Sequence, residues 1–215
     1  MPPKGIIIGI AGASGSGKTL VAETLYKNLP SDRVAILQED AYYKDLSHLS
    51  FSERTKFNFD HPKAFDHSLL VQHLKALIQG KSINHPLYDY TSHCRKKKSK
   101  KFGPYQIILL EGILILAVPE IRDLLKIKIY VDTPPDICLI RRLKRDILDR
   151  KRDVESVLTQ YQDSVRPMYL QFIEPSKIFA DIFLPHGGKN LVAIDMLKSK
   201  IENLLTKKST EKKVN

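Results

Sequence analysis

An apolar run at residues 5–11 leads directly into the octet Gly-Ala-Ser-Gly-Ser-Gly-Lys-Thr at residues 12–19. The octet matches the G-x-x-x-x-G-K-[ST] pattern of a phosphate-binding loop between a buried strand and a helix. Glycines let successive N–H groups approach phosphate oxygens, and the following helix adds the positive end of its dipole. In such a loop Lys18 bridges the β- and γ-phosphates and the Thr19 hydroxyl holds Mg²⁺. The predicted ATP-binding residues are Gly12, Ala13, Ser14, Gly15, Ser16, Gly17, Lys18 and Thr19.

Short apolar runs alternate with amphipathic stretches along the chain, a pattern typical of parallel βαβ units. We expect strands at 6–11, 34–37, 107–110, 127–131 and 181–184, and helices at 18–29, 66–79, 135–149, 154–171 and 190–205. Asp66 is the expected N-cap of the second helix. The prediction is an α/β fold with a five-stranded parallel sheet in one domain, residues 1–205. An insertion at about 41–104 and a lid at about 141–153 interrupt it, and a basic, disordered tail follows at 206–215.

Two carboxylates follow predicted strands at the sheet edge where ligands bind in open α/β folds. Asp40 comes after the second strand and is suited to orient and deprotonate a phosphoryl-acceptor hydroxyl. A surface turn acid is the alternative, and the position of Asp40 at this edge favours the functional role. Glu111 interrupts an apolar strand end, where a carboxylate is costly unless it is compensated. A magnesium-linked role and a structural ion pair are the alternatives for Glu111.

An arginine-rich segment occupies the predicted lid, where Arg141, Arg142, Arg145, Arg150 and Arg152 alternate with aspartates. Guanidinium groups on a mobile lid neutralise the charge that develops during phosphoryl transfer and exclude water. The same alternation fits a salt-bridged exposed helix. Because the chain also contains a phosphate loop, the lid interpretation of this segment is favoured.

Two polar-aromatic clusters lie inside the insertion, at residues 57–62 and 88–93. Aromatic walls with a few hydrogen-bonding groups suit a planar, hydroxyl-bearing ligand such as a nucleoside. Packing around a small β-hairpin is the alternative.

The formal net charge of +11 raises the possibility of a nucleic-acid partner. Much of the excess lies at residues 95–101 and in the tail, without interleaved aromatic residues, so a solvated hairpin or loop is favoured and nucleic acid is disfavoured. The most apolar stretch, residues 107–118, contains Glu111 and is shorter than the about 20 residues of a membrane span. The two cysteines have no metal-site spacing, and residues 1–5 contain no apolar signal segment, so a cytoplasmic protein without a membrane partner is expected.

Taken together, these residues resemble the uridine kinase (uridine–cytidine kinase) family, especially its bacterial form. The resemblance covers nearly the whole chain, and its strength lies in the order and spacing of many short motifs. Besides the phosphate loop, the motifs lie at 40–44, 57–62, 88–90 with His93, 111–114, 131–133, 142–146, 160–161, 165–167 and 175–177.

The resemblance implies a P-loop kinase fold with a β-hairpin over the nucleoside, and transfer of the γ-phosphate of ATP or GTP to uridine or cytidine. The implied catalytic residues are Asp40, Lys18 and Arg145. Arg145 and Arg150 would bind the triphosphate, and Thr19 and Glu111 would hold Mg²⁺. The implied nucleoside contacts are Asp60 and Arg142 on the ribose hydroxyls, Tyr88 and His93 on the base edge, Tyr43, Tyr90 and Phe59 around the pocket, and Arg152 and Gln160 nearby. A homotetramer, feedback binding of CTP or UTP, and a role in pyrimidine salvage are also implied.

Two positions depart from the family's usual pattern. Lys151 stands between Arg150 and Arg152 where glycine is common, and His186 precedes Gly187 where arginine is common. A titratable histidine near the donor predicts pH-dependent donor binding.

Three other function classes were weighed. A kinase of ribulose phosphate or pantothenate is disfavoured, because neither substrate carries a pyrimidine that the cluster at 88–93 could contact. A regulatory GTPase is disfavoured because the chain contains no Asn-Lys-x-Asp sequence. A nucleic-acid-binding ATPase is disfavoured by the charge distribution described above.

Overall fold

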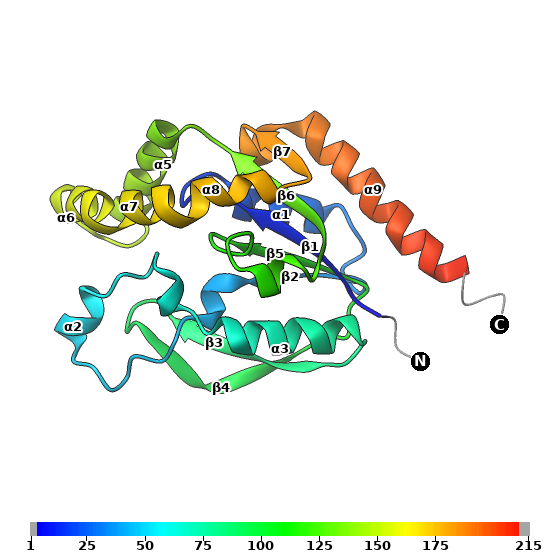
Figure 1. Ribbon diagram of the computed structural model, residues 1–215, viewed down its shortest axis with the longest axis horizontal. Helices are drawn as coiled ribbons and strands as arrows, with labels where there is room; N and C mark the ends of the chain where they lie inside the picture. Colours follow the sequence, from blue (N-terminus) through cyan, green and yellow to red (C-terminus); the bar gives the residue numbers. More distant parts are fainter. Residues whose placement is uncertain (1–3, 211–215) are drawn as a thin grey trace.

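Five parallel strands form the central sheet of the computed structural model, which describes residues 4–210 (Figure 1). The spatial order is β2-β5-β1-β6-β7, and all neighbouring pairs are parallel. This confirms the predicted fold class. The strand bounds are β1 Ile6–Ala11, β2 Val34–Gln38, β5 Ile107–Gly112, β6 Leu125–Asp132 and β7 Ile182–Pro185.

Helices cover both faces of this sheet, which explains why its strands are apolar without alternation. Ile7 and Ile108 belong to the core on the face covered by α3, His67–Ile78. Their neighbours Ile8 and Leu109 point to the opposite face, where they belong to the core shared with α1 and α9. Helix α1 spans Lys18–Lys27 and α9 spans Leu191–Thr210.

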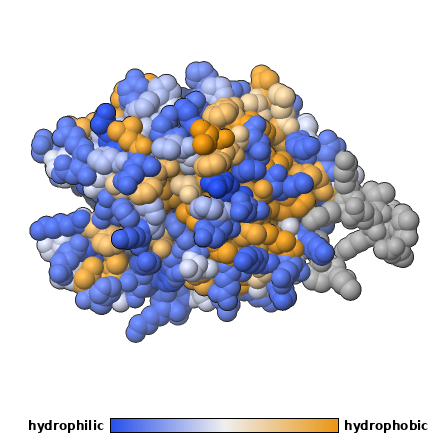
Figure 2. Space-filling view, viewed as in Figure 1, coloured by the Kyte–Doolittle hydropathy of each residue, from blue (hydrophilic) through white to orange (hydrophobic). Residues whose placement is uncertain are grey.

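The insertion between β2 and β5 contains an antiparallel hairpin, β3 Ile83–Asp89 and β4 Cys94–Phe102. The short helix α2, Phe51–Thr55, and helix α3 precede it, and Asp66 caps α3 by accepting a hydrogen bond from the Leu69 N–H (3.1 Å). Most of β4 is exposed, and hydrophilic side chains extend from this lower edge of the molecule (Figure 2). The basic run at 95–101 therefore lies on a solvated hairpin strand.

After β6 the chain forms a layer of helices on the side of the molecule away from the β3–β4 hairpin (Figure 1). Short α4, Pro119–Arg122, precedes β6, and α5, Pro135–Leu148, follows it. The helix expected at 154–171 continues to residue 176 as α6 Val154–Gln160, α7 Arg166–Met168 and α8 Glu174–Ser176, joined by two π-helical turns. Each π turn directly precedes a short segment that contains a proline, Pro167 or Pro175. Wider turns accommodate the missing N–H, so neither proline ends the helix.

The last helix is also longer than expected, because α9 reaches Thr210 rather than ending at Leu205. The rest of the predicted tail, 211–215, lies outside the described residues. Across residues 4–210, none of the helices combines the length and the apolar character that crossing a membrane requires.

Candidate active site

The phosphate loop, residues 12–19, joins β1 to α1, and its geometry requires glycine at two positions. Gly15 has φ of 84°, and a Cβ there would collide with the backbone oxygen of Cys138. Gly17, with φ of 96°, turns the chain into α1. Both conformations disfavour residues with a side chain. The loop therefore brings its backbone to the N-terminus of α1, as an anion site requires.

The carboxylate of Glu111, at the end of β5, lies beside the first turn of α1. It is 6% exposed and accepts hydrogen bonds from Thr19 Oγ1 (3.1 and 3.2 Å) and from Gln38 Nε2 (3.1 Å). Glu111 takes part in none of the ion pairs found among residues 4–210, which removes the structural ion pair as an explanation. A hydroxyl and a carboxylate that converge beside a phosphate loop form the oxygen-rich set that suits phosphate-bound Mg²⁺.

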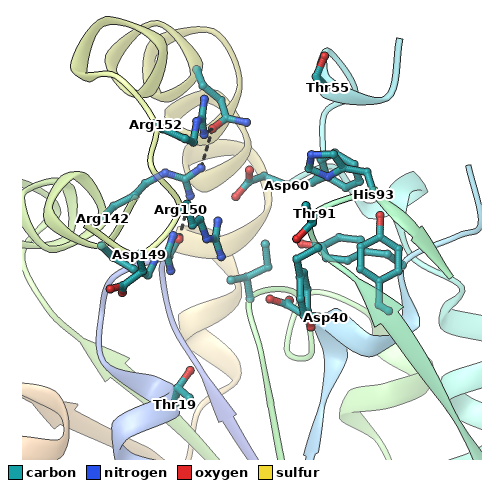
Figure 3. A pocket seen from close by; sticks show the side chains of 18 of the residues that line it. Thr19, Asp40, Thr55, Asp60, Thr91, His93, Arg142, Asp149, Arg150 and Arg152 are labelled. Carbon is teal, nitrogen blue, oxygen red and sulfur yellow. Dashed lines mark hydrogen bonds between the residues drawn. The ribbon is translucent and has the colours of Figure 1, made fainter. Parts of the chain in front are cut away.

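Asp40, labelled in Figure 3, follows β2 in a short 3₁₀ turn. It lines the same cavity as Lys18 and Glu111. Burial raises the pKa of this carboxyl from 3.8 to about 6, although the Lys18 charge opposes the rise. Nearby carboxylates, Glu111 and Asp60 among them, raise the pKa further. A carboxylate with this pKa is ionised at neutral pH and has more affinity for a proton than an ordinary aspartate.

Aromatic rings from the insertion line the other half of the cavity. Tyr43 stacks on Phe65 (4.4 Å between centroids), and Phe59 contacts both Tyr43 (5.2 Å) and His93 (5.0 Å, stacked). Tyr88 packs against Tyr43 at 5.2 Å. The two polar-aromatic clusters predicted from the sequence thus form one surface.

The hydroxyl of Tyr88 is buried and has no hydrogen-bond partner among the described residues. The adjoining Tyr90 ring, 5.3 Å away, is 48% exposed. A buried hydroxyl without a partner is uncommon in folded proteins. The Tyr88 side chain lines the cavity, whereas its hydroxyl oxygen is enclosed by the protein.

Asp60 and Arg142, both nearly fully buried, form the polar wall opposite the rings (Figure 3). Burial raises the pKa of Asp60, and the Arg142 charge is the main opposing influence. Arg142 is fixed by Ser14 Oγ (2.9 Å) and by Gln160 Oε1 (3.0 Å), which also accepts a hydrogen bond from Arg152 (2.6 Å).

The predicted lid, residues 141–153, comprises the second half of α5 and the turn that leads to α6, and Lys151 in that turn has φ of 53°. This left-handed conformation explains why glycine suits the position, and here a lysine occupies it. His186 also has positive φ, 64°, and lies exposed before Gly187, which packs against the Ser16 backbone.

The structure brings the predicted chemistry together in one cavity of about 560 Å³. The predicted residues that line it are Ser14, Lys18, Thr19, Asp40, Tyr43, Phe59, Asp60, Tyr88, Tyr90, His93, Glu111, Arg142, Arg145, Arg150, Arg152 and Gln160. Of the predicted residues, Gly12, Ala13, Gly15, Ser16 and Gly17 do not line it and instead shape the phosphate loop. Arg141, one of the predicted lid arginines, does not line it either and donates a hydrogen bond to the Ser16 carbonyl oxygen (3.2 Å).

Sequence reasoning missed Glu39, which is completely buried beside Asp40. Glu39 accepts hydrogen bonds from the Leu114 N–H (2.9 Å) and from His67 Nε2 (3.0 Å), so it ties the segment after β2 to α3 and to the chain after β5. The acidic pair Glu39-Asp40 was the only signal, and the pair does not reveal which carboxylate turns inward.

Asp146 was also missed as a site residue. Its carboxylate is fully buried in the lid and lies within 4 Å of four arginine side chains. An aspartate four residues after Arg142, within an arginine-rich segment, was the available signal.

Comparison with known proteins assigns the family. The sequence profile of the "Phosphoribulokinase / Uridine kinase family" matches residues 7–193. This chain belongs to that family. It is therefore a phosphotransferase enzyme with a nucleotide-binding P-loop.

Individual relatives agree with the family. The chain is 54% identical over 206 residues to a uridine kinase of Shewanella amazonensis, with 94% of this chain and 97% of that protein covered. It is 56% identical over 200 residues to the uridine kinase of Escherichia coli K12, with 91% and 94% covered.

Solved structures share the fold at low identity. A putative fructose transport system kinase from Silicibacter superposes with a TM-score of 0.67 at 21% identity, covering 85% of this chain and 91% of that one. The phosphoribulokinase of Rhodobacter spheroides gives 0.62 at 16% identity, covering 85% and 70%. These similarities confirm the P-loop kinase architecture.

Proposed function

We propose that this kinase transfers the γ-phosphate of ATP, or of GTP, to the 5′-hydroxyl of uridine or cytidine and so forms UMP or CMP. One observation carries the proposal: a phosphate loop, a carboxylate of raised pKa and an aromatic pocket with a polar wall open into one cavity. Relatives named uridine kinase, more than half identical over nearly the whole chain, support the choice of acceptor.

Asp40 is the proposed general base for the acceptor hydroxyl. Its ionised form accepts the proton as the oxygen attacks the γ-phosphorus, and its position between Lys18 and the aromatic pocket fits that task. Lys18, Arg145 and Arg150 are the proposed partners of the phosphate oxygens, where cations offset the charge of the transition state.

Thr19 and Glu111 are the proposed holders of Mg²⁺, which when bound neutralises charge on the donor phosphates. The Thr19 hydroxyl and the buried Glu111 carboxylate already converge. Mg²⁺ commonly uses one or two protein oxygens and completes its shell with phosphates and water.

The nucleoside is proposed to lie between the rings and the polar wall. Asp60 and Arg142 would hold the ribose 2′- and 3′-hydroxyls, with Arg152 and Gln160 close by. Tyr88 and His93 would hydrogen-bond the pyrimidine edge, and Tyr43, Tyr90 and Phe59 would enclose its faces. The position of Tyr88 and His93 in the lining of the same cavity supports this arrangement.

The deciding experiment is acceptor-dependent ADP release with ATP and Mg²⁺. Uridine and cytidine are expected to support turnover, whereas thymidine, adenosine, pantothenate, ribulose 5-phosphate and a no-acceptor control are not. ADP release without an acceptor, or none with any of these, would overturn the nucleoside assignment and leave only nucleotide binding.

The oligomeric state, the cellular location and the regulation of the enzyme are part of the same proposal. A cytoplasmic homotetramer that serves pyrimidine salvage and is inhibited by CTP or UTP follows from the family resemblance. Sedimentation of the purified protein tests the tetramer, and inhibition of uridine turnover by added CTP tests the feedback.

A further inference from the structure

One buried carboxylate, that of Asp146, is shared by four arginine side chains of the lid. Oδ1 lies 2.9 Å from Arg145 and 3.5 Å from Arg150. Oδ2 lies 3.6 Å from Arg152 and 3.8 Å from Arg142. Because one negative charge faces four positive ones, the cluster keeps an excess of positive charge that a polyphosphate can use.

Asp146 also anchors the lid through its backbone. Its carbonyl oxygen accepts a hydrogen bond from the Arg152 N–H (3.0 Å), so the chain that leaves α5 turns back onto it. The positive φ of Lys151 makes this return possible. Figure 3 shows Arg142, Arg150 and Arg152 gathered on one side of the pocket as a result.

The four arginines differ in what else holds them. Arg142 and Arg152 share Gln160 Oε1, and Arg142 also binds Ser14. For Arg145 and Arg150, Asp146 is the hydrogen-bond or ion-pair partner found within residues 4–210. These two side chains are also the more exposed, at 37% and 48%.

The charge of Asp146 supports Arg150 electrostatically as well. Burial and the charge of Arg145 lower the pKa of Arg150, whereas the Asp146 charge raises it. Without Asp146, Arg145 and Arg150 would repel each other with no carboxylate between them.

We propose that Asp146 is a positioning residue that holds Arg145 and Arg150 at the phosphate end of the cavity and acts on phosphoryl transfer through them. The proposal rests on the proposed function for the reaction that these arginines serve. The lid would then have two parts: Arg145 and Arg150 on the donor side are held by Asp146, and Arg142 and Arg152 on the nucleoside side are held by Gln160.

The test is Asp146→Asn, which keeps the shape of the side chain and removes its charge. We expect kcat/KM for ATP to fall about 30-fold and the Kd for ATP without acceptor to rise about fivefold, because misplaced groups lose most of their catalytic effect. KM for uridine is expected to stay within about threefold, since Arg142 and Arg152 keep their other partners. Equal losses for ATP and uridine would indicate a merely structural role and overturn the proposal.

Asp153→Asn is the matched control. Asp153 also belongs to the lid, is exposed, does not line the cavity and forms none of the ion pairs found in the described part of the chain, and asparagine can keep its capping of α6. The substitution removes the same charge, and an effect within about threefold is expected. A loss as large as that of Asp146→Asn would show that net lid charge, not positioning, is responsible.

A double-mutant cycle shows whether Asp146 acts through Arg145 and Arg150. In an Arg145→Ala/Arg150→Ala background, Asp146→Asn is expected to lower kcat less than about threefold further, because both positioned groups are gone. Additive losses would overturn the proposal. If Asp146→Asn does not fold, Asp146→Glu moves the charge without removing it: a loss in kcat/KM for ATP that exceeds the loss for uridine supports the proposal, and equal losses overturn it.

Failure of the proposed function is visible separately. Wild-type protein that does not phosphorylate uridine or cytidine contradicts the proposed acceptors. The ATP Kd of the variants, measured without acceptor, still decides whether Asp146 positions the donor-side arginines: an unchanged Kd would then overturn that role.

Discussion

The Thr19 hydroxyl, in the first turn of α1, lies 3.1 and 3.2 Å from the two carboxylate oxygens of Glu111, at the end of β5. These residues are 92 positions apart in the sequence, and the parallel sheet brings them to one edge. The pair joins the phosphate loop to the neighbouring strand at the proposed magnesium site.

Glu111→Gln tests this relationship. The amide keeps a hydrogen-bonding oxygen but loses the charge, so kcat is expected to fall about 10–100-fold and the Mg²⁺ concentration for half-maximal activity to rise. Titration of Mg²⁺ at saturating ATP and uridine measures both effects. Gln38→Ala, which removes only a hydrogen bond to Glu111, is the control and should change both quantities less. An unchanged Mg²⁺ requirement in Glu111→Gln would separate Glu111 from the metal.

The pH dependence of turnover should report Asp40. Its pKa of about 6 lies above the ordinary 3.8, so the base becomes protonated as pH falls through about 6. We expect kcat/KM for uridine to decrease about tenfold per pH unit below that point. A pH–rate profile from pH 5 to 8 measures this acid limb, the fall of kcat/KM at low pH. A flat profile across pH 6 would contradict the role of Asp40 as general base.

Asp40→Asn should remove the acid limb and lower kcat about 10²–10⁴-fold while ATP still binds. It should also stabilise the fold. Because the pKa of Asp40 is higher in the folded protein, its ionised form opposes folding at pH 7, and this penalty disappears at low pH. Thermal unfolding at pH 7 is expected to show a higher Tm than wild type. Near-normal turnover would exclude Asp40 from the chemistry.

The sequence predicted the sheet well because four of its five strands are mainly apolar runs, and β6, which carries Lys126 and Lys128, keeps an apolar run at 129–131. It failed where tertiary packing overrides local rules. The helix after the lid was predicted to end at 171, yet π turns before Pro167 and Pro175 carry it to residue 176. The helices α2 and α4 have only five and four residues, too few to show a helical period.

For the site, the strand-end rule predicted Asp40 and Glu111 correctly as cavity residues. Glu39 and Asp146 were not predicted because their roles come from burial. Glu39 binds His67, 28 positions away, and Asp146 gains Arg152 only because the chain reverses at Lys151. Charge patterns along a sequence do not show which carboxylate is enclosed.

Asp60→Ala should impair ribonucleosides selectively. Asp60 is 7% exposed and is influenced by the charge of Arg142, so its loss removes a buried partner from a substrate hydroxyl while Arg142 keeps Ser14 and Gln160. We expect kcat/KM for uridine to fall about 10²-fold and that for 2′-deoxyuridine to fall much less. Parallel kinetics with both nucleosides make the comparison. Equal losses would show that Asp60 does not read the ribose.

Tyr88→Phe should weaken uridine binding without lowering the stability of the fold. The Tyr88 hydroxyl is buried without a partner among the described residues, and burial raises its pKa, so it remains a neutral donor. Its removal is expected to raise KM for uridine about tenfold, the effect of one lost hydrogen bond, and to leave KM for ATP unchanged. Because an unpaired buried hydroxyl costs free energy, Tm should stay the same or rise. Tyr105→Phe, outside the cavity, should change neither KM. An unchanged KM for both uridine and cytidine in Tyr88→Phe would mean that this hydroxyl does not contact the base.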